Sequence, residues 1–285
     1  MPNWSYNKIG LQGSKETVQK FINLGLENSD LKPTNDIRKD FELLVNDGKT
    51  KKCVGENGEP IKEVRLTART FLPMPDTFIL YNTTNHPNKY PIEIVKEQAE
   101  KYGAVGWYDY NIKTLGTKWN FNLEAAELRE VGNGKWRIVF DCETAWSAPT
   151  VWCETIKSMF PELKVFIAAH EESNAYIECG EYCEGGDYNT YSDYTGDMNN
   201  MYEEYDNKRD EFIENLRNDK EKMEAITENV RKKMADENRE ESEEVLIQWE
   251  LESLAEDELG DWCDDEEDIY DNLHQDFYAM MDEKI

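Results

Sequence analysis

The chain has 285 residues, a length that suits two domains or one domain with a large extension. Its 61 acidic and 32 basic residues give a net charge of −29, which excludes direct nucleic-acid binding through a basic face and disfavours anionic membranes. Aromatic residues make up 12% of the chain, enough material for a packed core. Because the sequence shows neither an apolar signal peptide nor a run of ~20 apolar residues, we expect a cytoplasmic protein without a membrane segment.

The first part of the chain carries the signals of strands and helices in alternation. Ser14 has the character of a helix N-cap, and Gly132-Asn133-Gly134 indicates a β-hairpin. The expected elements are, in chain order, a strand over 8–12, a helix from Ser14, an insertion over 29–75 with a helix near 35–45 and a strand near 63–70, a helix over 92–102 ended by Gly103, strands over 124–131 and 135–141, a helix from Pro149 to about 160, and strands over 163–169 and 174–182. This order predicts an α+β fold, a ferredoxin-like split βαβ layer with an insertion, followed by a long acidic α-helical arm.

The charge is distributed unevenly. Residues 1–170 hold 22 acidic and 22 basic residues, whereas residues 171–285 hold 39 acidic and 10 basic residues. A stretch rich in glycine, tyrosine, aspartate and asparagine separates the two parts, and such a stretch is typical of a boundary. We therefore predict a ferredoxin-like domain over 1–186, a linker over 187–201 and an acidic helical arm over 202–285.

The predicted arm has a heptad pattern, with apolar residues at alternating spacings of three and four between Tyr202 and Val230. Two further helices are expected over 240–259 and 267–281. An apolar seam needs a partner, so we expect either a homo-oligomer or a hairpin made with the later helices. The seam residues are Tyr205, Phe212, Leu216, Met223, Ile226 and Val230.

Four segments in the first part have distinctive sequences. They are MPNW at the start, LGTKWN at 115–120, FDCETAWSAPTVW at 140–152 and FPELKVFIAAHEE at 160–172. These segments resemble the YubB-type ferredoxin-like proteins of phages and plasmids, in scattered blocks over residues 1–186. The chain departs from that pattern at Ser5, Leu115 and Ala148. The resemblance implies the ferredoxin-like fold, a mobile-element origin and hence the cytoplasm of a bacterial host, but no particular activity.

The tryptophans of these segments have two interpretations. The first is that they wedge the helices onto the sheet, as large apolar groups beside turns do. The four tryptophans concerned are Trp4, Trp119, Trp146 and Trp152, and the expected core contains Phe140, Trp146, Trp152, Phe160 and Val165. The second is that the rings line a ligand pocket, with a polar edge made of Thr117, Lys118, Thr144 and Ser147.

Catalytic and metal-binding motifs are lacking in the sequence. It contains no glycine-rich phosphate loop, no HExxH and no GxSxG. His86, His170 and His274 are far apart, and although His170 could act as a general base, a structural role is expected. Cys179 and Cys183 form a CxxxC pair without a second pair, so no metal is expected there. We predict neither enzymatic activity nor a cofactor.

Two functions remain open. The first is a counter-defence inhibitor from a phage or other mobile element, whose acidic arm mimics DNA and binds the basic surface of a bacterial defence nuclease or helicase. Its partner-binding residues would be Trp262, Asp264, Asp265, Glu266, Glu267 and Asp268, a dense acidic run beside an aromatic anchor. The alternative is a small-ligand-binding or enzymatic ferredoxin-like domain that uses the arm for oligomerisation.

Overall fold

The structure of the protein is a computed structural model, which describes residues 3–29, 31–46, 53–54, 60–61, 66–81, 90–183, 185, 187–237, 241–259 and 263–284. The chain divides into two compact units. The first, which we call the α+β unit, comprises Met1–Asp193 and Leu273–Ile285, and the second, the acidic helical unit, comprises Tyr194–Asn272. The boundaries differ from those predicted, because the end of the chain returns to the α+β unit.

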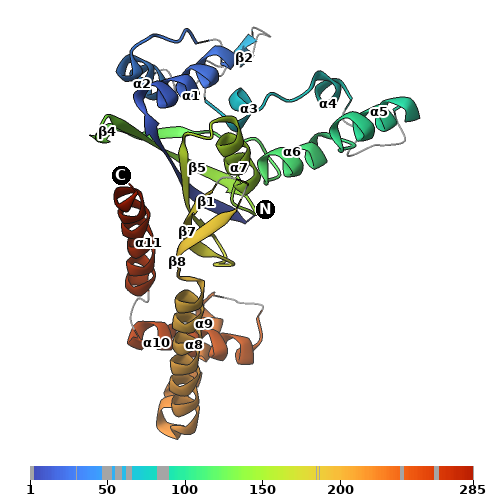
Figure 1. Ribbon diagram of the computed structural model, residues 1–285. Coiled ribbons are helices and arrows are strands. Elements are labelled where there is room, and N and C mark those ends of the chain that lie inside the picture. The colour runs from blue at the N-terminus through green and yellow to red at the C-terminus, as the bar shows by residue number, and fades with distance from the viewer. Residues whose placement is uncertain are drawn as a thin grey trace. The chain divides into compact units, whose positions relative to one another are not determined.

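A six-stranded sheet with the order β4-β5-β1-β6-β7-β8 forms the centre of the α+β unit (Figure 1). All neighbouring strands in it are antiparallel. The strands are β1 (Trp4–Ser14), β4 (Glu124–Gly132), β5 (Lys135–Ala145), β6 (Lys164–Glu171), β7 (Ile177–Tyr182) and β8 (Tyr188–Asp193). The predicted α+β class is therefore confirmed. A separate two-stranded pair joins β2 (Cys53–Val54) to β3 (Pro60–Ile61).

The helices of the α+β unit begin and end at residues whose local chemistry favours those boundaries. Ser14 caps the first helix, where its hydroxyl oxygen accepts a hydrogen bond from the backbone N–H of Thr17 at 3.1 Å. Gly103 ends another with φ +63°, a left-handed conformation that glycine adopts without strain. The helices are α1 (Lys15–Asn28), α2 (Ile37–Asn46), α3 (Ala68–Phe71), α4 (Asp76–Leu80), α5 (Ile92–Tyr102), α6 (Trp107–Leu115) and α7 (Thr150–Met159).

One predicted strand, near 63–70, is wrong where the structure describes it. Ala68–Phe71 is the short helix α3, while residues 62–65 lie outside the described part of the chain. The Thr70 hydroxyl donates a hydrogen bond to the backbone oxygen of Thr67 at 2.7 Å and accepts one from its N–H at 3.3 Å. These two bonds stabilise a helical turn in place of an extended strand.

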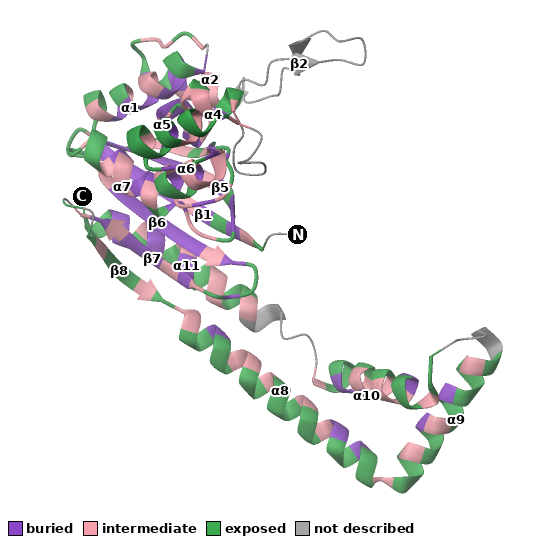
Figure 2. Cartoon of the chain, turned by 90° about the vertical axis from the view of Figure 1, so that its right-hand side faces the viewer, coloured by how far each residue is buried: buried purple, intermediate pink, exposed green. Residues whose placement is uncertain are grey.

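The two faces of the sheet pack against different helices. Residues such as Ile9 and Leu11 point to one face, where they join a buried cluster with α1 and α7. Gly10 points to the opposite face, and a side chain there would collide with Met281 of α11 (Cys263–Glu283). The absence of a side chain at Gly10 leaves the space that Met281 occupies against the strand. Figure 2 shows β1 and β6 as largely buried strands.

The predicted core is correct for Phe140, Trp152 and Val165, which have no exposed surface. Phe160 is partly buried against the same cluster. Trp146, however, is 47% exposed, so its placement in the core is wrong. It follows the end of β5 with φ +68°, and its N–H donates to the backbone oxygen of Asn3 at 2.9 Å. This turn directs the indole ring away from the core.

The acidic helical unit consists of α8 (Thr195–Asn218), α9 (Lys220–Glu237), α10 (Glu243–Leu259) and the first part of α11. The predicted linker over 187–201 is wrong, because β8 and the start of α8 occupy most of it. The heptad pattern between Tyr202 and Val230 spans two helices, because α8 and α9 are separated at Asp219. The Asp219 carboxylate accepts a hydrogen bond from the N–H of Lys222 at 3.2 Å and so caps α9.

The apolar seam of α8 and α9 packs on α10 within the same chain. Leu216, Ile226 and Val230 are buried in one cluster with residues of α10, and Phe212 and Met223 pack against it. Tyr205 is only half-buried. The α10 members of the cluster are Leu246, Leu251 and Ala255. Among the helices described, none is long and apolar enough to cross a membrane.

Candidate functional site

The acidic helical unit carries most of the net negative charge of the protein. Between residues 194 and 272 the sequence has 29 acidic and 9 basic residues. Along α8, Glu203, Asp206, Asp210 and Glu214 follow one another at spacings of three and four, and all four are exposed. Arg209 contacts Asp206 at 3.0 Å and Asp210 at 3.5 Å, so the charge of the row is partly neutralised in its middle.

Of the predicted partner-binding residues, Asp264 to Asp268 lie at the start of α11, and the side chains that the structure describes there have different surroundings. Glu266 accepts hydrogen bonds from the hydroxyl groups of Tyr202 at 3.3 Å and Tyr270 at 2.9 Å, which gives it an internal role in holding α11 to α8. Glu267 and Asp268 are exposed. Trp262 lies outside the described residues, as do the side chains of Asp264 and Asp265.

An exposed aromatic residue does occur on α10. Trp249 is 49% exposed and Val245, one helical turn earlier, is 41% exposed. Trp249 and Glu250 also line a small cavity of about 220 Å³ together with Lys233 of α9. The sequence pattern places Val245 and Trp249 with Leu246 on one apolar face, but only Leu246 is buried. Val245 and Trp249 form an i, i+4 pair on α10, respectively one position before Leu246 and two positions before Leu251, which are both buried.

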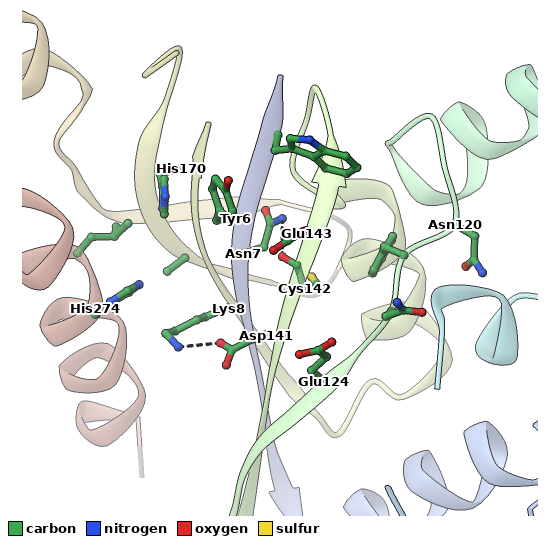
Figure 3. Close-up of a pocket in the computed structure, with 15 residues that line it drawn as sticks. Tyr6, Asn7, Lys8, Asn120, Glu124, Asp141, Cys142, Glu143, His170 and His274 are labelled. Atoms are coloured by element: carbon green, nitrogen blue, oxygen red, sulfur yellow. Dashed lines mark hydrogen bonds and ion pairs between the residues drawn. The ribbon is translucent and has the colours of Figure 1, made fainter. Parts of the chain in front are cut away.

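A larger pocket, with a volume of about 680 Å³, lies on the α11-facing side of the sheet (Figure 3). Tyr6 of β1 forms its centre, with Glu143 of β5 opposite on one side and His170 of β6 opposite on the other. His274 contributes to the wall from α11. The Tyr6 and His170 rings stack with their centroids 5.1 Å apart. The pocket therefore depends on three adjacent strands and a helix far away in the sequence.

The charged side chains of this pocket are predominantly acidic. Lys8 forms an ion pair with Asp141, with 2.7 Å between Nζ and Oδ1. Glu124 lies opposite Asp141 across the strand pair, and both Glu124 and Glu143 are exposed. Within the described part of the chain, no lysine or arginine forms an ion pair with either glutamate. Burial, with the nearby His274, lowers the pKa of His170 to about 4, so this imidazole is neutral at physiological pH.

Half-buried Trp4 and the exposed Trp119 and Trp146 form a tryptophan cluster at the edge of the pocket. Trp4 lines the pocket, and its ring centroid is 5.9 Å from that of Trp119. The Lys118 ammonium group lies 4.9 Å from the Trp119 ring centroid and 4.4 Å from that of Trp146. Both Trp119 and Trp146 are exposed, so the prediction that they wedge helices onto the sheet is wrong for them, whereas it is correct for Trp152.

Three of the four polar residues predicted to edge a tryptophan pocket form hydrogen bonds to the backbone instead. The Thr117 hydroxyl accepts a hydrogen bond from the N–H of Ala145 at 3.1 Å and lies 2.9 Å from its carbonyl oxygen. Thr144 donates to the backbone oxygen of Ser147 at 2.8 Å. Ser147 in turn donates to the backbone oxygen of Gly116 at 2.7 Å. These bonds hold the turn that presents Trp146, and Lys118 alone of the predicted edge touches the rings.

The cysteine pair is occupied by local contacts. The sulfur of Cys179 lies 3.0 Å from the hydroxyl oxygen of Ser192, and Cys183 accepts a contact of 3.0 Å from the side-chain amide of Asn189. Burial raises the pKa of Cys179. In the ranges that the structure describes, no group of three or more histidine, cysteine or acidic side chains is placed to hold a metal ion. His86 lies outside those ranges.

Comparison with known proteins gives little further information. No protein-family model and no curated protein matches the chain. Among solved structures, the crystal structure of the protein api92 from Yersinia pseudotuberculosis, described as DUF1281, is 10% identical and has a TM-score of 0.29. The match covers 67% of this chain and 99% of that chain. A similarity of this size carries no argument about function.

Proposed function

We propose that the chain is an interaction protein of a phage or another mobile element, which inhibits a bacterial defence nuclease or helicase by docking onto its basic nucleic-acid-binding surface. The observation that carries this proposal is the presence, in one helical unit, of 29 acidic residues and an exposed tryptophan, Trp249. The mobile-element origin rests on the resemblance to the YubB-type proteins. The docking surface rests on the charge and exposure of the acidic helical unit.

The physical basis of docking is electrostatic attraction followed by apolar contact. Carboxylates three and four residues apart on a helix lie about 5–6 Å from one another, so an acidic row such as Glu203 to Glu214 presents regularly spaced negative charge. Such a field attracts a basic surface and speeds encounter. Tryptophan is enriched among the residues that dominate binding energy at interfaces. Trp249, with Val245 beside it, supplies that anchor within an acidic surrounding.

We also propose that the α+β unit is a ferredoxin-like layer and that the acidic helices form its appended arm. In support, four of the strands have the order β4-β5-β1-β6. This is the strand order of a split βαβ fold, in which β5 lies between β1 and β4. Two more strands, β7 and β8, extend this layer. Because α10 covers the seam of α8 and α9, self-association through that seam is not part of the proposal.

Capture from bacterial lysate by the immobilised full chain tests the docking proposal. Deletion of 201–285 is unsuitable, because it removes Phe277 and Met281, which are buried in the α+β unit. Point substitutions are therefore used. A captured nuclease or helicase whose activity is inhibited supports the proposal, and its absence contradicts it.

The charge and anchor contributions are separated by kinetics with the captured partner. Neutralising Glu203, Glu214, Glu267 and Asp268 to Gln or Asn should slow association by about tenfold and flatten its salt dependence, because steering acts on the on-rate. Trp249→Ala should instead raise the dissociation rate. The matched control neutralises two exposed glutamates of the α+β unit, Glu130→Gln and Glu162→Gln. If both sets of substitutions have equal effects, mimicry by the acidic helical unit is wrong.

A further inference from the structure

We propose that the pocket on the α11-facing side of the sheet binds a small organic cation, a molecule whose recognised group is an ammonium. This inference goes beyond the docking proposal and does not depend on it. The volume of about 680 Å³ lies in the range of small-molecule sites, about 300–1,000 Å³. Its walls come from β1, β4, β5, β6 and α11 and from the segment 120–122 before β4, so most of the lining residues belong to helices and strands of the α+β unit.

The charge of the pocket selects the sign of the ligand. Lys8 is neutralised by Asp141 at 2.7 Å, so the cationic side chain in the lining does not offset the remaining acids. Glu124 of β4 lies opposite Asp141 of β5, and Glu143 follows Asp141 by two positions, so both glutamates are on the same face of the sheet. Neither glutamate forms an ion pair with a described lysine or arginine. His170 adds no positive charge at neutral pH because its imidazole is neutral. An anionic ligand is disfavoured by these two carboxylates.

The rings of the pocket favour the same ligand. Trp4 and Tyr6 both line it, and Tyr6 is 40% exposed, so part of its ring is open to a bound molecule (Figure 3). The face of an indole or phenol ring attracts ammonium groups through its negative quadrupole, most strongly for tryptophan. A ligand seated here would meet ring faces from one side and carboxylates from another, the arrangement by which proteins recognise quaternary and alkylated ammonium ions.

The neighbouring tryptophan cluster provides an independent example of this chemistry within the same unit. The Lys118 ammonium lies 4.4 Å from the Trp146 ring centroid and 4.9 Å from that of Trp119. Trp119 is in ring contact with Trp4, which belongs to the pocket. Trp146 is held in this position by a left-handed backbone conformation, φ +68°, that is strained for a large side chain. The strain is maintained by the hydrogen-bonded turn around Thr117 and Ser147.

Calorimetric titration of the full chain with matched pairs of probes tests the inference. The two cations are choline and putrescine, and their uncharged counterparts of similar shape are 3,3-dimethylbutan-1-ol and butane-1,4-diol. We expect at least one cation to bind roughly tenfold or more tightly than its counterpart, because the attraction depends on the charge. Equal binding of cation and counterpart would mean an apolar cavity, and no binding of either cation would refute the site.

Substitutions locate the binding in the pocket. Glu124→Gln with Glu143→Gln removes both uncompensated charges from exposed positions and should weaken the bound cation by about tenfold. Trp4→Leu should weaken choline more than its uncharged counterpart. The control, Glu130→Gln, removes an exposed glutamate from β4 outside the pocket lining and should leave affinity unchanged. Thermal melting of each variant verifies folding. If the double variant binds as the unmodified protein does, the cation is not held here.

Discussion

Arg137 of β5 and Asp282 of α11 are 145 positions apart, and their side chains form an ion pair with 2.7 Å between Nη2 and Oδ1. The Arg137 side chain has no exposed surface, whereas that of Asp282 is 57% exposed. Arg137 also donates from Nε to the side-chain oxygen of Gln12 at 3.3 Å. A buried guanidinium is costly unless an acid compensates it, so this contact ties the end of the chain to the sheet.

Loss of this ion pair should therefore destabilise the α+β unit. Asp282→Asn leaves the buried guanidinium without its carboxylate and should lower the free energy of unfolding by about 1–3 kcal/mol. The loss is limited because the Asp282 side chain is largely exposed, so water replaces part of the lost contact. Urea denaturation followed by tryptophan fluorescence measures the change. Asp271→Asn, at an exposed position of the same helix, serves as the control. Equal stabilities of the two variants would show that the contact adds nothing.

Substitution of Trp152 should lower the free energy of unfolding strongly, whereas substitution of Trp146 should change it little. Trp152 is fully buried, and Trp152→Ala should cost about 3–5 kcal/mol. Trp146 is exposed and has φ +68°, so Trp146→Gly relieves a strained backbone, but glycine also gives the unfolded chain more conformational freedom. Because these two effects oppose each other, the free energy of unfolding should change by less than about 1 kcal/mol. Thermal and chemical denaturation of both variants gives the comparison. A large loss of stability for Trp146→Gly would place its ring in the core.

Leu216→Asp should unfold the acidic helical unit without altering the mass of the protein particle in solution. The side chain is 7% exposed in the cluster that joins α8, α9 and α10, and a carboxylate there is buried without a partner. We expect a loss of at least about 3 kcal/mol together with a loss of helical circular dichroism. Light scattering should give the same mass before and after substitution. A mass that falls would mean that the seam joins two copies of the chain.

The pH dependence of stability should include a contribution from His170. Its folded-state pKa of about 4 lies below the ordinary value of 6.5, because the ring is buried beside Tyr6 and near His274. Between these two values the unfolded chain binds a proton here and the folded chain does not, so stability falls as the pH decreases from 6.5 to 4. His170→Gln should flatten the curve of unfolding free energy in this window.

Nuclear magnetic resonance titration of the imidazole provides the direct measurement. The His170 resonance should remain that of the neutral ring down to pH values well below 6.5. His274→Gln removes the neighbouring imidazole and should raise the pKa of His170. Titration of His170 near its ordinary value in the folded protein would contradict both the burial and the coupling.

Elements whose boundaries depend on neighbours within a few residues could be predicted from the amino-acid sequence. Ser14 caps α1 through a bond to Thr17, three positions away, and Gly103 stops α5 by its own freedom of φ. Gly132-Asn133-Gly134 all have positive φ, as the tight hairpin between β4 and β5 requires. The uneven charge is likewise a property of composition. These features were predictable because the interactions that create them are local.

Other features depend on contacts between residues far apart in the chain and could not be predicted from a local pattern. The turn that exposes Trp146 includes a hydrogen bond from its N–H to the backbone oxygen of Asn3, near the N-terminus of the chain. The return of α11 to the sheet depends on Arg137 and on the space left by Gly10. The pocket brings Tyr6, Glu143 and His170 together from three strands whose register no single segment encodes. Strand order and register arise from the packing of the whole sheet, so side chains that meet across it carry no mark of one another in the sequence.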